Sequence, residues 1–139
     1  MKIDSRELLL KAIEAREASY SPYSNISVGA ALLTKSGKVY LGQNIENASF
    51  SPTVCAERVA FFKAISEGER DFAAIAIVGE KHGNEPSGNF PPCGVCRQVM
   101  SEFCDLDDFK VILVKNVNEH KTVTLRELLP YSFGSENLK

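Results

Sequence analysis

The chain has 139 residues, of which 44% are hydrophobic and 24% charged, and this composition indicates one folded domain over residues 1–139. A chain of this length can bury roughly two-thirds of the surface that its unfolded form exposes, so it needs no disulfide framework to fold. Sixteen Lys and Arg against eighteen Asp and Glu give a formal net charge of -2, which argues against nucleic acid as the main partner because no basic excess is available to neutralise phosphates.

The N-terminal part of the chain begins with a helix pattern and continues with a hairpin pattern. Its first twenty residues include several charged side chains, which is not the apolar core of a secretory signal. Asp4 and Glu7 form a capping pattern before apolar residues at helical spacing, which predicts a helix to about Ser19. Residues 26–33 and 39–41 have the composition of strands, and the Ser-Gly turn between them predicts a β-hairpin.

The rest of the chain alternates between helical and strand patterns. Helices are expected over residues 54–65, about 93–103 and 124–130, strands over 72–78 and 110–114, and a loop over 81–92. This alternation predicts an α/β fold, a three-layer α/β/α sandwich around a mixed β-sheet. The longest apolar run, residues 72–78, is far shorter than the ~20 residues that span a bilayer, so we expect a cytoplasmic protein with no membrane partner.

The four cysteines are the next feature to explain, since in a reducing compartment cysteines are more often metal ligands or catalytic groups than disulfides. Cys93 and Cys96 have a spacing that lets two sulfurs hold one metal, and Cys55 supplies a third sulfur from another predicted helix start. Unpaired backbone N–H groups and the helix dipole stabilise a thiolate at such a start. Three sulfurs suit a tetrahedral zinc with one open position, which is typical of a catalytic site.

The remaining cysteine and both histidines fit this site less well. Cys104 lies eight residues after Cys96, which places it ~12 Å further along the predicted helix, and we interpret it as a small buried side chain. His82 and His120 stand in polar, loop-like surroundings, and we expect both in solvent.

A redox role is an alternative interpretation of the Cys-x-x-Cys motif. It leaves residues 55–57 unexplained, and a long loop replaces the strand expected immediately before such a motif. The combination of Cys-x-Glu with Pro-Cys-x-x-Cys is the three-cysteine variant of the zinc deaminase signature. The chain resembles the small homotetrameric class of cytidine deaminases over nearly its whole length, through the motifs at 22–24, 28–32, 44–48, 55–58, 92–98 and 128–130 and through Phe133.

The resemblance implies that Cys55, Cys93 and Cys96 hold one Zn2+ per subunit and that Glu57 is the catalytic proton carrier. The chemistry asks for such a set independently, because deamination needs an activated water, which zinc can supply, and a carboxylate that moves protons. Without the ligand beside it, Glu57 could equally be an acidic residue placed for the helix dipole.

Three thiolates carry more negative charge than zinc neutralises, which weakens the pull of the metal on its water. Hydrogen-bond donors to the sulfurs would withdraw some of that charge. The resemblance gives Arg58 this role of zinc-site tuning. Arg97 is a lower-ranked candidate for the same role and could equally be a solvated side chain.

The implied reaction is the hydrolytic deamination of cytidine and 2'-deoxycytidine to uridine and 2'-deoxyuridine, a step of pyrimidine salvage, by a homotetramer. The substrate-binding residues implied by the resemblance are Ile26, Asn44, Glu46, Ala48, Phe50, Ala56 and Phe133. Asn44 and Glu46 match the ribose-binding pair, and the N–H of Ala56 would hold the pyrimidine carbonyl. Phe50 and Phe133 would act on the pocket of a neighbouring subunit, and ordinary core packing is the alternative for both.

Two of these residues depart from the family pattern. Ile26 stands where the family usually has an aromatic residue, which removes a stacking ring worth ~1 kcal/mol, and Phe50 stands where tyrosine is frequent.

Three alternative functions follow from the residues. A deaminase of a cytosine-containing antibiotic such as blasticidin S is disfavoured by the ribose pair, polynucleotide editing is disfavoured by the charge balance, and a non-catalytic zinc module would need a fourth protein ligand.

Overall fold

The structure, a computed structural model of the chain, describes residues 4–139. Five strands form one sheet in the order β2-β1-β3-β4-β5, in which β3 and β4 are parallel and the other neighbours are antiparallel. The strands are β1 (Ile26–Thr34), β2 (Val39–Gln43), β3 (Phe72–Lys81), β4 (Lys110–Asn116) and β5 (Glu119–Thr124). The helices are α1 (Ser5–Arg16), α2 (Ala56–Ser66), α3 (Gly94–Phe103), α4 (Leu125–Leu128) and a 3-10 helix, η1 (Ser135–Leu138).

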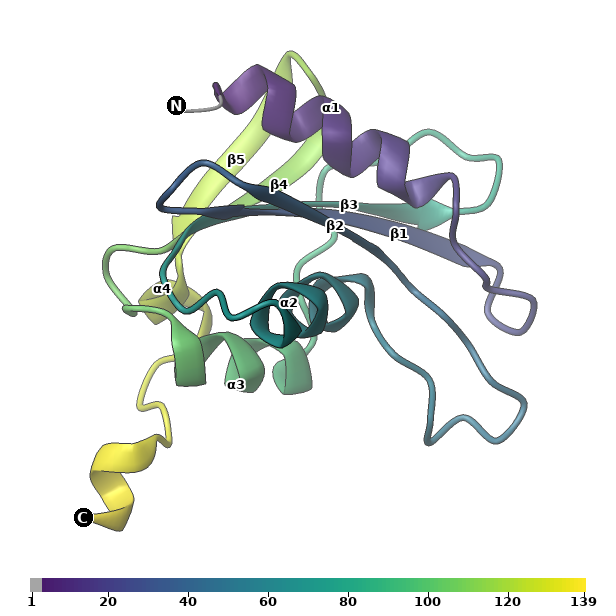
Figure 1. Cartoon of the computed structure of the whole chain (residues 1–139). Helices are drawn as coiled ribbons and strands as arrows, with labels where there is room; N and C mark the ends of the chain where they lie inside the picture. Colours follow the sequence, from purple (N-terminus) through teal and green to yellow (C-terminus); the bar gives the residue numbers. More distant parts are fainter. Residues whose placement is uncertain (1–3) are drawn as a thin grey trace.

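The sheet is covered on both faces, with α1 on one side and α2 and α3 on the other (Figure 1). One core cluster joins α1 to Ala31, Ala76 and Ile112, and a second joins α2 and α3 to Leu32 and Ile77. Strands with two covered faces are apolar at successive positions instead of alternating, which explains the long buried runs of β1 and β3. The prediction of a three-layer α/β/α sandwich around a mixed sheet is therefore confirmed.

Helix α1 is shorter than the sequence predicts. The Asp4 side chain caps its start, as the capping pattern indicates. The helix ends at Arg16, three residues before the expected end at Ser19, because the chain turns there to run beside a distant loop. Tyr20 N donates to Asn44 O at 3.0 Å in that pairing.

Strand β5 is an element that the sequence does not predict. Its first four residues are exposed and polar, so no apolar alternation marks them as a strand. The strand forms because Asn116 Oδ1 accepts hydrogen bonds from Asn118 N and Glu119 N, at 2.8 and 3.0 Å, and these close a tight turn after β4. The result is a polar edge strand, a common way to leave a sheet edge in solvent.

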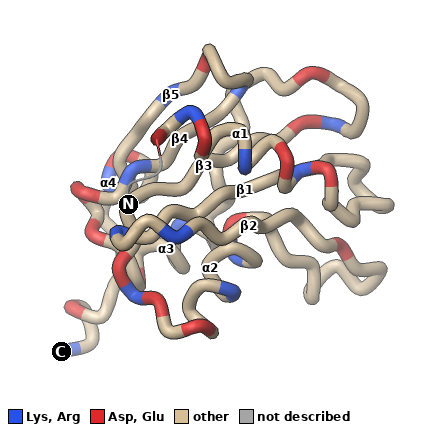
Figure 2. The backbone as a smooth tube through the Cα atoms, turned by 45° about the horizontal axis from the view of Figure 1, so that its top comes forward, with Lys and Arg blue, Asp and Glu red and all other residues tan. Residues whose placement is uncertain are grey.

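Acidic and basic residues are interspersed along the chain around the fold (Figure 2). This distribution agrees with the near balance of acidic and basic residues. Within residues 4–139, no helix combines the length and the apolar character needed to cross a lipid bilayer.

The start of helix α2 lies directly against strand β2, and Gly42 of β2 permits that approach. A Cβ on Gly42 would lie 2.2 Å from Ala56 O and 2.6 Å from Ala60 N, both of which are backbone atoms of α2. No side-chain rotation can relieve such an overlap. The absence of a side chain at residue 42 therefore sets the height of the α2 start above the sheet.

We expect Gly42→Ala to lower the free energy of unfolding by at least about 2 kcal/mol, because the added methyl group forces the helix away from the sheet. Gly134→Ala is the matched control, since nothing lies within 4 Å of a Cβ there, and it should change stability by less than about 0.5 kcal/mol. Urea denaturation followed by circular dichroism measures both variants. Equal stability of the two would contradict the role given to Gly42.

Candidate functional site

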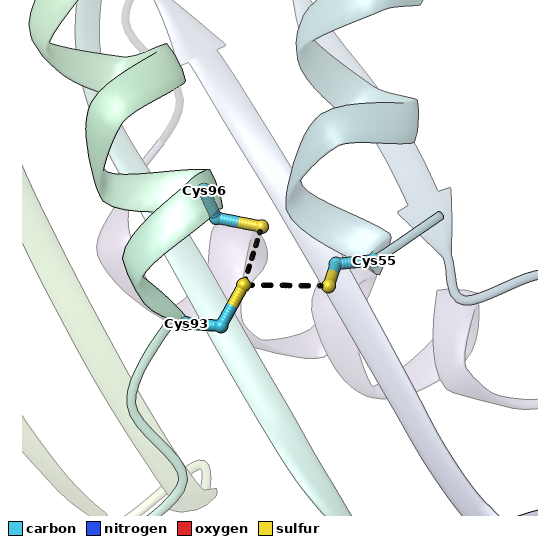
Figure 3. Close-up of side chains that lie close together, drawn as sticks. All are labelled: Cys55, Cys93 and Cys96. Atoms are coloured by element: carbon cyan, nitrogen blue, oxygen red, sulfur yellow. Dashed lines mark hydrogen bonds between the residues drawn. The ribbon is translucent and has the colours of Figure 1, made fainter. Parts of the chain in front are cut away.

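Three cysteines meet where the starts of α2 and α3 approach each other (Figure 3). Cys55 is the N-cap of α2, Cys93 is the N-cap of α3, and Cys96 lies in the first turn of α3. The Sγ atom of Cys93 is 3.6 Å from that of Cys55 and 3.6 Å from that of Cys96. All three sulfur atoms lie within 4.8 Å of one another.

This geometry fits one zinc ion. Sulfur atoms bound at ~2.3 Å to a tetrahedral zinc lie ~3.8 Å apart, which is close to the separations in the cluster. The three sulfurs would occupy three corners of the tetrahedron and leave the fourth for water or substrate. Within residues 4–139, no second group of three or more His, Cys, Asp or Glu side chains has such a geometry.

The other candidate ligands stay away from this cluster. Cys104 follows the last residue of α3 and packs against the core, and burial raises the pKa of its thiol to about 12. His82 and His120 are exposed. All three thus stay out of the sulfur cluster, as the sequence predicts, although Cys104 is half-buried and lies just beyond α3 rather than within it.

Hydrogen bonds within the cluster favour a thiolate at Cys55. A hydrogen bond from the Cys96 thiol, with further ones from Arg58 and Cys93, lowers the pKa of Cys55 to about 5 against the opposing effect of burial. The pKa of Cys96 is raised, because its proton is held in the bond to Cys55 and because it is buried. Since the thiolate is the form that binds metal, the cluster is prepared for a cation.

Glu57 lies in the first turn of α2, two residues after Cys55. Its side chain is only 4% exposed. Burial, together with the negative charge of Cys55, raises the pKa of Glu57 to about 7. At neutral pH such a carboxyl group can both accept and return a proton, as general acid–base catalysis requires.

The two arginines beside the ligands have different partners. Arg58 donates from Nη2 to the Sγ of Cys55 at 3.5 Å, as expected of a residue that withdraws charge from sulfur. Arg97 donates instead to two backbone carbonyl groups, those of Pro92 at 2.7 Å and Leu128 at 2.6 Å. Arg97 is therefore neither a donor to the thiolates nor a freely solvated side chain.

Asn44 holds neighbouring segments of the chain together by hydrogen bonds and is also a candidate binding group. Its Oδ1 atom accepts hydrogen bonds from Ser19 Oγ at 2.6 Å and from Val28 N at 2.9 Å, and its Nδ2 atom donates to Ile26 O at 2.8 Å. An asparagine amide has two acceptor sites and two donor hydrogens. One N–H of Asn44 remains free for a ligand. Ser19 has no part in any sequence motif, so nothing in the sequence indicates this contact.

Glu46 is held in a similar way by the loop before β1. Its Oε1 atom accepts from the backbone N–H groups of Tyr23 and Ser24, each at 3.0 Å, and its Oε2 atom accepts from the Ser24 hydroxyl. Burial alone would raise the pKa of Glu46, but the hydrogen bonds from Ser24 and Tyr23 together lower it. The ionised carboxylate keeps one acceptor site on Oε2.

A pocket of about 260 Å³ opens beside Glu46, and its lining residues are Tyr23, Ser24, Glu46, Phe50 and Thr53. The rings of Tyr23 and Phe50 meet edge to face, with centroids 6.2 Å apart. Thr53 is two residues from Cys55, a reach of at most ~7 Å along an extended chain. One wall of the pocket is therefore formed by the segment that leads into the first sulfur ligand.

The other predicted binding residues are distributed unevenly around this pocket. Ala56 is the first residue of α2, where a backbone N–H has no acceptor within the helix. Ile26 is half-buried and packs against the same core cluster as Cys55, whereas Ala48 is exposed in the loop after β2. All three belong to segments that border the pocket or the cysteines.

Phe50 and Phe133 are both exposed, by 70% and 57%, so core packing is the wrong interpretation for either. They do not share a pocket within one chain. Phe133 borders a separate hollow near the C-terminus, together with Leu106 and Asn137. The structure thus brings together the three cysteines, Glu57 and Arg58, and leaves Phe133 away from the pocket at Glu46.

Comparison with known proteins identifies relatives of the chain. The family model described as the cytidine and deoxycytidylate deaminase zinc-binding region matches residues 2–113. The chain is 50% identical over 136 residues to a cytidine deaminase of Halalkalibacterium halodurans, covering 98% of each chain. The crystal structure of cytidine deaminase from Burkholderia pseudomallei superposes with a TM-score of 0.83 at 44% identity, covering 94% of this chain and 100% of the other. For the Mycobacterium tuberculosis enzyme the TM-score is 0.79 at 34% identity, with 96% and 99% covered.

Metal analysis of the purified protein should find about one zinc per chain. Cys55→Ala and Cys93→Ala should each lose most of this zinc, because two sulfurs cannot replace a three-ligand site. Cys104→Ala is the control and should keep its zinc. Full zinc occupancy in Cys93→Ala, or zinc loss in Cys104→Ala with the fold intact, would contradict the assignment of the ligands.

Proposed function

The chain belongs to the cytidine and deoxycytidylate deaminase family, and we propose that it hydrolyses cytidine and 2'-deoxycytidine to uridine and 2'-deoxyuridine, with release of ammonia. We infer a single domain over residues 1–139, which supplies the zinc ligands and the proton carrier. The observation that supports this function most directly is a zinc-compatible cluster of three sulfurs with a buried carboxyl group, Glu57, beside it. A binding module would need no such carboxyl group, whereas hydrolysis of an amidine needs one to move protons.

Zinc held by Cys55, Cys93 and Cys96 would lower the pKa of a bound water toward ~7 and so provide the nucleophile. Glu57 accepts a proton from the attacking water and passes it to N3 of the pyrimidine while the C4–O bond forms. It then takes the remaining hydroxyl proton and delivers it to the exocyclic amino group. The C4–N bond breaks, ammonia leaves, and the ring keeps a carbonyl at C4 and a proton on N3.

The electrostatic setting of Glu57 suits this double transfer. Burial raises the pKa of Glu57, so its protonated form is accessible and the return of a proton to the substrate is easier than from an exposed carboxylate. Arg58 supports the reaction indirectly, because its hydrogen bond to Cys55 withdraws charge from a sulfur ligand.

Recognition of the sugar rests on the groups that Asn44 and Glu46 leave free. Asn44 has one unused N–H donor and Glu46 one unused acceptor site, because the fold occupies the others. A sugar hydroxyl both donates and accepts, so one donor beside one acceptor suits it. This match supports a nucleoside with a free sugar hydroxyl as the substrate, and not an isolated base.

We also infer a homotetramer in the cytoplasm that serves pyrimidine salvage. The exposure of Phe50 and Phe133 supports the assembly, because a neighbouring subunit could cover both rings. In such an assembly Phe133 would reach the substrate pocket of a neighbouring subunit, as the family resemblance implies. Light scattering tests the assembly through the molar mass, and cell fractionation tests the location.

Glu57→Gln should bind zinc normally and yet lose nearly all turnover, since the amide keeps the shape of the carboxyl group but cannot carry protons. The loss should be at least about 10³-fold in kcat for cytidine, measured by the absorbance change on conversion to uridine. Glu102→Gln, at an exposed position of α3, is the matched control and should keep wild-type kinetics.

Activity of Glu57→Gln near the wild-type level would contradict the proposed mechanism.

Assays of the wild-type protein with and without a chelator, on cytidine and on blasticidin S in parallel, test the substrate assignment. Turnover of blasticidin S alone would overturn it.

Glu46→Gln should raise the KM for cytidine by about 10- to 100-fold with a smaller change in kcat, because it removes the charged acceptor of a sugar hydroxyl. Gln can still accept from the backbone N–H groups that hold Glu46, so the loop should keep its fold. The same substitution should change the KM for 2',3'-dideoxycytidine by less than about threefold, since that nucleoside lacks the ring hydroxyls. An equal loss for both substrates would refute the contact.

A further inference from the structure

Arg97 joins two segments that are far apart in the sequence. Its Nε atom donates to Pro92 O at 2.7 Å, and its Nη1 atom donates to Leu128 O at 2.6 Å. The side chain is half-buried. Among residues 4–139, no carboxylate forms an ion pair with it. The guanidinium therefore donates to neutral carbonyl groups, so its effect is to fix the positions of these groups rather than to neutralise a charge.

The first of these carbonyl groups belongs to the metal site. Pro92 is buried and immediately precedes Cys93, the N-cap of α3. The backbone N–H of Arg97 also donates to Cys93 O at 3.0 Å. The backbone and the side chain of Arg97 therefore both hold the main chain at Pro92 and Cys93, where one sulfur ligand is attached.

The second carbonyl group belongs to the C-terminal segment. Leu128 is the last residue of α4, and carbonyl groups at the C-terminal end of a helix lack N–H donors within the helix. The next residue of α3, Gln98, donates from Nε2 to Phe133 O at 2.8 Å. Arg97 and Gln98 together thus hold both ends of the segment 128–133 against α3, which lies beside α4 in the fold (Figure 1).

We propose that Arg97 is a positioning residue that couples the zinc ligand Cys93 to the segment carrying Phe133. Its planar fork fixes two carbonyl groups at once, whereas a lysine ammonium on a flexible stem cannot hold both in the same way. Metal retention and the presentation of Phe133 then depend on one side chain. The role of Phe133 at a neighbouring pocket rests on the proposed function, but the coupling itself does not.

Arg97→Lys tests the coupling by two measurements made without substrate. Zinc transfer to a chromogenic chelator should be at least about 10-fold faster than in the wild-type protein, since loss of a group that orients a ligand commonly weakens metal binding 10- to 100-fold. Hydrogen exchange should be faster at the amides of residues 129–134. Arg126→Lys is the matched control, because Arg126 is an exposed arginine of α4 paired with Asp107, and it should resemble the wild-type protein in both measurements.

Gln98→Ala separates the two effects. It should speed hydrogen exchange near residue 133 while leaving zinc transfer unchanged, because the Gln98 side chain donates its hydrogen bond to Phe133 O and not to the segment before Cys93. Arg97→Gln, which can still donate to one carbonyl group, repeats the test in case Arg97→Lys does not fold. Wild-type zinc transfer in the folded Arg97 variants, or faster transfer with no change at 129–134, would overturn the coupling. A failure of cytidine turnover would contradict the proposed function and leave both of these measurements intact.

Discussion

The site depends on the close approach of two helix starts. Cys55 is the N-cap residue of α2 and Cys93 that of α3, so the sulfur atoms gather at the positive ends of two helix dipoles. The sulfur atoms lie 3.6 Å apart and would repel one another as thiolates unless positive charge lies nearby, and the helix dipoles and Arg58 supply part of it. The sheet permits the approach because Gly42 lets α2 lie directly on β2.

The same packing places a carboxyl group where its protonation can change at neutral pH. Glu57 is buried because α2 is pressed against the sheet, and burial raises its pKa to about 7. An exposed glutamate would stay ionised and return a proton less readily. One helix start thus provides a metal ligand at Cys55, the proton carrier at Glu57 and a donor to sulfur at Arg58.

The candidate binding groups are also structural groups. Asn44 fixes the start of β1, and Glu46 fixes the loop before it. Such side chains are rigid before a ligand arrives, so binding loses little conformational entropy. Because most hydrogen-bonding sites of Asn44 and Glu46 are already occupied by the fold, few remain free, and this restricts the ligands that they can bind. Arg97 likewise links the site to the fold, because it donates a hydrogen bond to Leu128 O in the C-terminal segment.

The sequence by itself determined the α/β layering, the positions of most elements and the pairing of Cys93 with Cys96, because capping, apolar spacing and ligand spacing act over a few residues. It did not indicate β5, whose polar residues carry no strand pattern, or the end of α1, which a contact with a distant loop decides. The motifs also predicted that Cys55 joins the other two sulfurs, and the fold brings the three together. Only the tertiary structure decided that Arg97 bonds carbonyl groups in place of thiolates, and that Phe133 lies away from the pocket of its own chain. Each of these contacts, or its absence, depends on how segments far apart in the sequence pack, and no local pattern encodes that packing.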